Sequence, residues 1–137
     1  QEVHSKYLDY YRSKLSPDYE LIGKNYNYLV TKKSSLGKVE NLGSFPLGDR
    51  EILLCWSERQ KLLILNLHAP HQIDLKIEIE KSFSQFWKSQ RLDQMYSPSR
   101  ILVLGDFNDC YFKPLVELKL LGRKLKQHGE SEYSCCT

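Results

Sequence analysis

The sequence predicts an α/β fold in which two packed mixed β-sheets carry helices on their outer faces. Three observations lead to this expectation: an early pair of short strands, two long apolar runs in the middle of the chain, and an amphipathic helix followed by a third apolar run. A hairpin followed by a strand–helix–strand sequence is typical of a mixed sheet with helices packed outside it. The 137 residues are a single-domain length.

The first part of the chain is expected to form a helix and a hairpin. Apolar residues at helical spacing predict an amphipathic helix over residues 2–15, and the Ser16, Pro17, Asp18 run ends it. Tyr19–Ile22 and Tyr26–Thr31 are typical of two short strands. Gly23, Lys24 and Asn25 separate them, which predicts a hairpin.

The middle of the chain contains the clearest strands. Lys32–Gly48 is rich in Gly and Ser and contains a Pro, so we expect mostly loop, with one strand around Lys38–Leu42. Ile52–Trp56 and Leu62–Leu67 are continuous apolar runs joined by a polar turn. Such runs predict strands that are buried on both faces.

The last part of the chain is predicted to alternate helix and strand. A wide apolar stripe predicts a helix over Gln72–Gln90, and Arg91–Ser99 is expected to be a loop. Arg100–Leu104 predicts a third buried strand. A short helix is expected over Pro114–Leu121, because Pro can open a helix and the Gly122 that follows can close it.

Composition sets only loose limits on function. The net charge of +3 and the sequence pI near 8.6 permit a phosphate-rich partner without requiring one. The four cysteines have neither metal-ligand nor disulfide-scaffold spacing, which favours a reducing compartment such as the cytoplasm but leaves localisation open. No apolar stretch has the length of a membrane span. The oligomeric state is not predicted.

Polar side chains follow two of the predicted buried strands. Asn66 and His68 end one strand, and Asp106 and Asn108 follow the other. Because side chains alternate along a strand, each pair is expected on one side of its strand. His68 can donate a hydrogen bond or a proton near a phosphate, while Asp106 and Asn108 can orient water and phosphoryl oxygens. Turn residues and a surface histidine are the alternative interpretation, but a polar pair at each of two strand ends favours a metal-assisted phosphoester hydrolase.

The ordered motifs resemble those of the endonuclease/exonuclease/phosphatase superfamily. Gln1-Glu2 is similar to its metal-binding Gln-Glu, Asn66-Leu67-His68 to its Asn-x-His, and Gly105-Asp106-Phe107-Asn108 to its Gly-Asp-Phe-Asn. His68-Ala69-Pro70 resembles the deoxyribonuclease I-like members, and Asp49-Arg50-Glu51 resembles a position where that subgroup has a phosphate-binding Arg. The resemblance covers nearly the whole chain, 1–137, as a partial domain of the α/β/β/α sandwich type.

The resemblance implies specific roles for these residues. Glu2 would bind Mg²⁺, with Mn²⁺ as the alternative metal, and His68, Asp106 and Asn108 would be catalytic. Asn66 and Arg50 would contact the substrate phosphate. The implied function is a phosphodiester hydrolase, first of all a nuclease acting on DNA or RNA. A phosphomonoesterase or a lipid phosphodiesterase, acting on phosphorylated inositol or lipid, is the alternative.

The chain also departs from the pattern of the superfamily. The family's first strand and its late Ser-Asp-His, which supplies a water-activating dyad, are absent. His128 is not in that context. We therefore expect a domain truncated at both ends, whose isolated chain hydrolyses DNA poorly or serves as a non-catalytic fragment.

Overall fold

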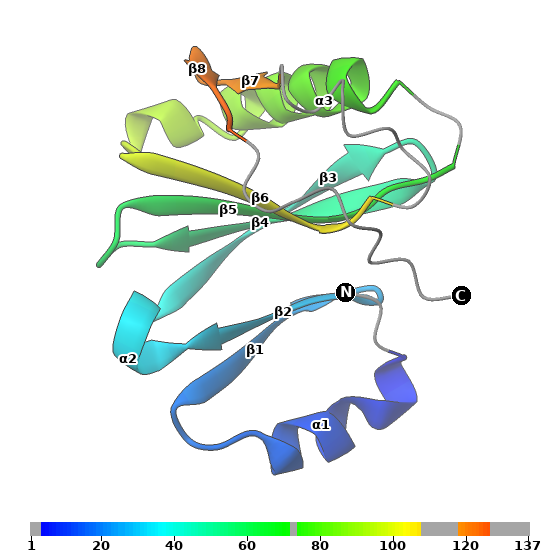
Figure 1. The fold of residues 1–137 in the computed structure, drawn as a ribbon, viewed down its shortest axis with the longest axis vertical. Helices are drawn as coiled ribbons and strands as arrows, with labels where there is room; N and C mark the ends of the chain where they lie inside the picture. Colours follow the sequence, from blue (N-terminus) through cyan, green and yellow to red (C-terminus); the bar gives the residue numbers. More distant parts are fainter. Residues whose placement is uncertain (1–3, 72–73, 108–117, 127–137) are drawn as a thin grey trace.

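The computed structural model describes residues 4–71, 74–107 and 118–126. The chain folds into four layers (Figure 1). Helix α3 (Leu75–Ser89) covers one face of a four-stranded sheet, the hairpin of β1 and β2 lies on its other face, and α1 (Leu8–Lys14) lies outside the hairpin. The predicted fold class, two packed sheets with outer helices, is confirmed. Only the larger sheet is mixed, because the smaller one is a single antiparallel pair.

The first helix and the hairpin form as predicted, but their boundaries differ from the predicted ones. A 3-10 turn over Ser5–Tyr7 precedes α1, and the hairpin strands are β1 (Tyr19–Lys24) and β2 (Asn27–Lys32). The connecting turn has two residues, Asn25 and Tyr26, both with positive φ (51° and 67°). Two such residues are typical of the type I′ turn, whose twist matches that of the flanking strands.

The segment predicted to be mostly loop contains a long edge strand. A short helix, α2 (Lys33–Leu36), leads into β3 (Val39–Leu47), which pairs with β4 through a register shift between Asn41 and Gly43. Pro46 is tolerated because β3 lies at the edge of the sheet, where one side of the strand needs no ladder partner. Two of the residues that suggested a loop, Gly43 and Pro46, are therefore features of a bulged edge strand.

The central strands match their predicted bounds closely, but the prediction of a third buried strand is wrong. β6 (Arg100–Asp106) is an edge strand of the sheet and has no buried residue, with Leu102 42% exposed. β4 (Arg50–Ser57) pairs antiparallel with β5 (Leu62–His68), and β5 pairs in parallel with β6. Helix α3 makes the crossover between the two parallel strands, and its N-cap residue Asp74 accepts a hydrogen bond from the Ile77 N–H. A 3-10 turn over Leu92–Gln94 lies in the predicted loop.

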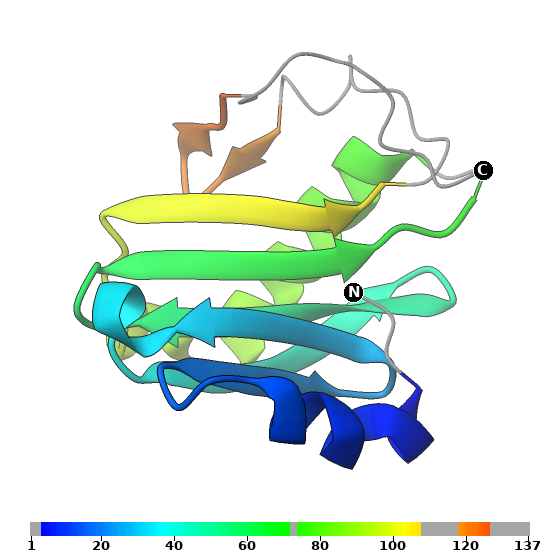
Figure 2. The same cartoon turned by 60° about the horizontal axis from the view of Figure 1, so that its bottom comes forward.

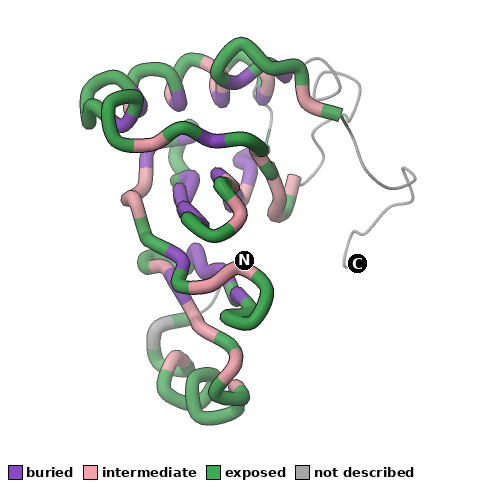
Figure 3. The backbone as a smooth tube through the Cα atoms, turned by 90° about the vertical axis from the view of Figure 1, so that its left-hand side faces the viewer, coloured by how far each residue is buried: buried purple, intermediate pink, exposed green. Residues whose placement is uncertain are grey.

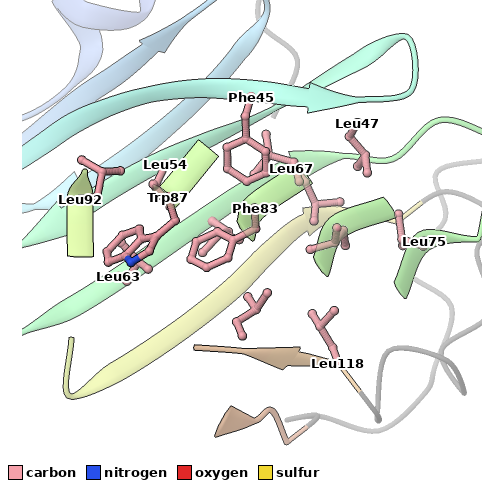
Figure 4. Close-up of a cluster of buried hydrophobic side chains, with 14 of the residues drawn as sticks. Phe45, Leu47, Leu54, Leu63, Leu67, Leu75, Phe83, Trp87, Leu92 and Leu118 are labelled. Atoms are coloured by element: carbon pink, nitrogen blue, oxygen red, sulfur yellow. The ribbon is translucent and has the colours of Figure 1, made fainter. Parts of the chain in front are cut away.

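Side-chain alternation along β4 and β5 divides the core in two. One set of strand residues packs against α3 (Figure 4): Ile52, Leu54, Trp56, Leu63, Leu65 and Leu67, with Leu75, Ile79, Phe83 and Trp87 of the helix. The other set packs with the hairpin: Leu53, Cys55 and Ile64, with Ile22 and Leu29. Buried positions concentrate where the layers meet (Figure 3). Burial also raises the pKa of the Cys55 thiol to about 12.

The predicted helix over Pro114–Leu121 is wrong where it can be compared. Its described end forms a small hairpin instead, β7 (Lys119–Leu120) with β8 (Arg123–Lys124), visible beside α3 in Figure 2. Leu121 and Gly122 turn the chain with positive φ (51° and 73°), which a continuing helix would not allow. Residues 114–117 lie outside the described residues. No helix among the described ranges is long and apolar enough to cross a membrane.

Candidate functional site

The carboxyl ends of the two parallel strands meet at one edge of the larger sheet. His68 and Asp106 are partners in the β5–β6 register, and the Ala69 N–H donates to the Asp106 carbonyl oxygen at 2.7 Å. Figure 2 shows β5 and β6 ending side by side. His68 shares the side of β5 occupied by Ile64, which packs toward the β1–β2 hairpin. The expected juxtaposition of His68 and Asp106 is therefore present in the fold.

A pocket of about 280 Å³ opens next to this edge, between the two sheets. Three segments build it: the β1–β2 turn, the start of β4 and the end of β5. Its lining residues are Asn25, Tyr26, Asn27, Asp49, Arg50, Glu51 and His68. The pocket brings together Arg50 and His68, which the sequence assigned separately to phosphate binding and catalysis.

A tight turn brings Arg50 close to the end of β5. Leu47 and Arg50 pair across the two residues Gly48 and Asp49, and Gly48 has a φ of 62°. A glycine with positive φ at the first position is typical of a type II′ hairpin turn. A Cβ added to Gly48 would lie 3.1 Å from the Pro70 Cγ, so the turn packs closely on the residue two positions after His68.

Asn66 lies inside the structure rather than on the pocket surface. Its side chain is 1% exposed, and its Nδ2 donates to the Asn27 Oδ1 at 2.8 Å and to the Tyr28 carbonyl oxygen at 2.9 Å. Both amide hydrogens are therefore used, and its Oδ1 is buried without a hydrogen-bond donor among the described residues. This placement does not support the predicted direct contact with substrate phosphate. Asn66 instead joins the hairpin to the sheet.

Asn27 is one of the pocket residues that the sequence interpretation missed. It is 7% exposed, and its Nδ2 donates to the backbone oxygens of Glu51 and Asn66, each at 3.0 Å. It thus connects three strands directly behind the pocket. The available signal was its spacing, because Asn27, Leu29 and Thr31 alternate on one buried face of β2. A polar residue on such a face needs a specific partner.

Gly105 allows β6 to approach β5 closely before Asp106. Its φ is 133°, and an added Cβ would lie 1.9 Å from the Leu67 carbonyl oxygen. No side chain fits at this distance, so the glycine is a steric requirement of the strand pairing. Turn residues were the alternative interpretation of this motif, but Gly105 lies within the β5–β6 ladder.

Two predicted site residues, the metal ligand Glu2 and the catalytic residue Asn108, lie outside the described residues. Within the described ranges, no three His, Cys, Asp or Glu side chains are grouped closely enough to hold a metal ion. The donor chemistry still suits Mg²⁺, because Asp49 and Glu51 line the pocket and Asp106 lies at the adjacent strand end. Mg²⁺ is commonly bound by one or two carboxylates together with water and substrate phosphates.

Comparisons with known proteins do not assign the chain to a family. No protein-family model matches the chain, and no curated protein or solved structure matches it significantly. The class that the fold defines is an α/β sandwich with a polar pocket between its sheets.

Proposed function

We propose that the chain belongs to a Mg²⁺-dependent phosphodiester hydrolase that acts on nucleic acid. The observation that carries the proposal is the convergence of Arg50 and His68 on one pocket, with Asp106 in register beside the histidine. The sequence motifs and the family resemblance assign all three residues to phosphate chemistry. Their common location supports a single phosphate site.

The pocket residues have complementary chemical roles in this proposal. The Arg50 guanidinium can bind two phosphate oxygens, and the His68 imidazole can donate a hydrogen bond or a proton to the group that leaves. Asp106 can orient the attacking water. Glu2 and Asn108 would complete the site as metal ligand and phosphate-positioning residue.

The charge of the pocket favours the use of a metal. Asp49 and Glu51 bring two carboxylates to the same pocket as Arg50. Without a cation these carboxylates would oppose an entering phosphate. When bound, Mg²⁺ would neutralise part of this charge and polarise the phosphoryl group.

The rim of the pocket favours a nucleic acid over a small phosphomonoester. Tyr26 is 48% exposed at the tip of the hairpin and lines the pocket. An exposed aromatic ring beside a phosphate site can stack on a base or sugar of a bound strand. This is the feature of the described residues that distinguishes the nuclease proposal from the monoesterase alternative.

The proposal is tested with the activated diester bis(4-nitrophenyl) phosphate. Its leaving group needs no protonation, so even weak turnover should be measurable. We expect Mg²⁺-dependent, EDTA-sensitive release of nitrophenolate, and faster turnover of the diester than of 4-nitrophenyl phosphate. Asp106→Asn should lower this rate on the order of a hundredfold. His68→Ala should lower the rate comparably with an unactivated DNA substrate, whose leaving group needs protonation.

His71→Ala is the matched control, because His71 is exposed and is not a lining residue of the pocket. This variant should keep the parent rate. Parent turnover equal to the Mg²⁺ blank would contradict the hydrolase proposal. Full activity in both site variants would contradict the assigned roles, and preference for the monoester would favour the phosphomonoesterase alternative.

A further inference from the structure

We infer that a second groove, on the opposite face of the larger sheet, holds the phosphate backbone of a nucleic-acid strand. The groove lies between α3 and the β7–β8 hairpin and has a volume of about 590 Å³. Its charged lining is dominated by lysines: Lys76, Lys88, Lys119 and Lys124, against the single acid Glu80. The identity of this occupant rests on the proposed nuclease function.

The acid in the groove is already engaged within the protein. Glu80 accepts hydrogen bonds from the Lys76 Nζ at 3.0 Å and from the Lys119 backbone N–H at 2.7 Å. Partial burial acts to raise the pKa of Glu80, but these hydrogen bonds outweigh it and the pKa is lowered. The carboxylate is therefore ionised at neutral pH and fastens the hairpin to the helix.

Two of the other lysines that line the groove have no carboxylate partner to offset their charge. In the part of the chain that the structure describes, Lys88 and Lys124 have no salt bridge to a carboxylate. Lys119 and Lys124 are direct partners across the small hairpin. Like charges directly opposite each other destabilise a strand pair, and this hairpin has only two residues per strand to offset them. A bound anion would relieve the repulsion.

The shape of the groove favours an extended polyanion. Lys76 and Lys88 are twelve residues apart on α3, which corresponds to about 18 Å along the helix axis. Figures 1 and 2 show that α3 begins at the end of the sheet where β5 and β6 end. The groove therefore extends away from the candidate catalytic edge, as a strand entering or leaving that edge would.

The lining also indicates how the strand would be recognised. The aromatic residues that line the groove, Phe83 and Trp87, are only 2% and 4% exposed, so they cannot stack on bases. Recognition would then depend on phosphate charge and not on sequence. A hollow between a helix and a hairpin also suits a single backbone better than the flat surface of a membrane.

The test is fluorescence anisotropy with a labelled oligodeoxythymidylate of roughly 20 nucleotides, in EDTA and at several salt concentrations. The variant Lys88→Glu/Lys124→Glu should bind on the order of tenfold more weakly. The dependence of log K on log salt should also be less steep by roughly 0.7 for each lost phosphate contact. Circular dichroism would verify that the variant is folded.

The matched control is Lys38→Glu/Lys81→Glu, which changes the net charge equally at exposed lysines outside the groove. Equal weakening in both variants would show a net-charge effect and overturn the proposal, as would unchanged binding in the groove variant. Binding of the parent protein to phosphatidylserine vesicles but not to the oligonucleotide would instead assign the groove to a membrane. Because EDTA prevents metal-dependent turnover, loss of binding in the groove variant supports the groove even if the diester assay fails.

Discussion

At the scale of single residues, the two buried asparagines determine how the pocket is held. Asn27 and Asn66 lie 39 residues apart in sequence and exchange side-chain and backbone hydrogen bonds. Buried amides are costly to leave unpaired, so each depends on the other. The pair fixes the hairpin, which carries Asn25 and Tyr26, against the strands that carry Glu51 and His68.

Removing one partner should therefore destabilise the fold measurably. Asn27→Ala leaves the Asn66 amide and two backbone oxygens without their donor or acceptor, and we expect a loss of about 1–3 kcal/mol in the free energy of unfolding. Urea denaturation measures this value. In a double-mutant cycle with Asn66→Ala, the two effects should be non-additive by at least about 0.5 kcal/mol. Strict additivity would mean that the two amides act independently.

The position of a single residue could be predicted where it depends only on its neighbours in sequence. The side on which His68 lies follows from strand alternation alone, and the structure places it beside Asp106. The burial of Asn66 could not be predicted in the same way, because its partner Asn27 is far away in sequence. An asparagine at the same position in an exposed strand end could have contacted a phosphate.

At the scale of elements, the β5–β6 pairing depends on one glycine. Gly105→Ala would place a methyl group against the Leu67 carbonyl in a backbone conformation that L-residues rarely adopt. We expect destabilisation on the order of 3 kcal/mol or more, measured by thermal or urea unfolding.

Gly122→Ala is the control for the backbone conformation alone. Gly122 also has a positive φ, 73°, but an added Cβ would meet nothing within 4 Å. Its cost should be limited to about 1 kcal/mol. If the two variants were equally stable, the close approach of β6 to β5 would not be a real constraint.

Element prediction was accurate where hydrophobic patterns were strong. β4, β5 and α3 have long apolar runs or stripes, and all three were predicted near their observed boundaries. β3 was underestimated because its Gly and Pro residues are typical of loops, although an edge strand with a bulge accepts both. β7 was predicted as the end of a helix because Pro114 and Gly122 are typical helix-opening and helix-closing residues, and strands of two residues give little alternation.

At the scale of the whole molecule, the candidate site exists only when both sheets are assembled. The hairpin supplies Asn25 and Tyr26, while the larger sheet supplies Arg50, Glu51 and His68. The sequence motifs named Arg50 and His68 of this pocket and the adjacent Asp106, but not the hairpin that closes the pocket. That closure comes from layer packing, which sequence spacing does not encode.

The most direct test of this account is to locate a bound phosphodiester on the folded protein. In ¹H–¹⁵N spectra, a slowly hydrolysed phosphorothioate dinucleotide added with Mg²⁺ should shift the His68 ring and the Arg50 Nε resonances together and saturably. The shifts should be weaker without Mg²⁺, because the carboxylates of the pocket would then oppose the ligand. Shifts confined to other residues, with His68 and Arg50 unchanged at saturation, would contradict the proposal that the pocket between the sheets is a phosphodiester site.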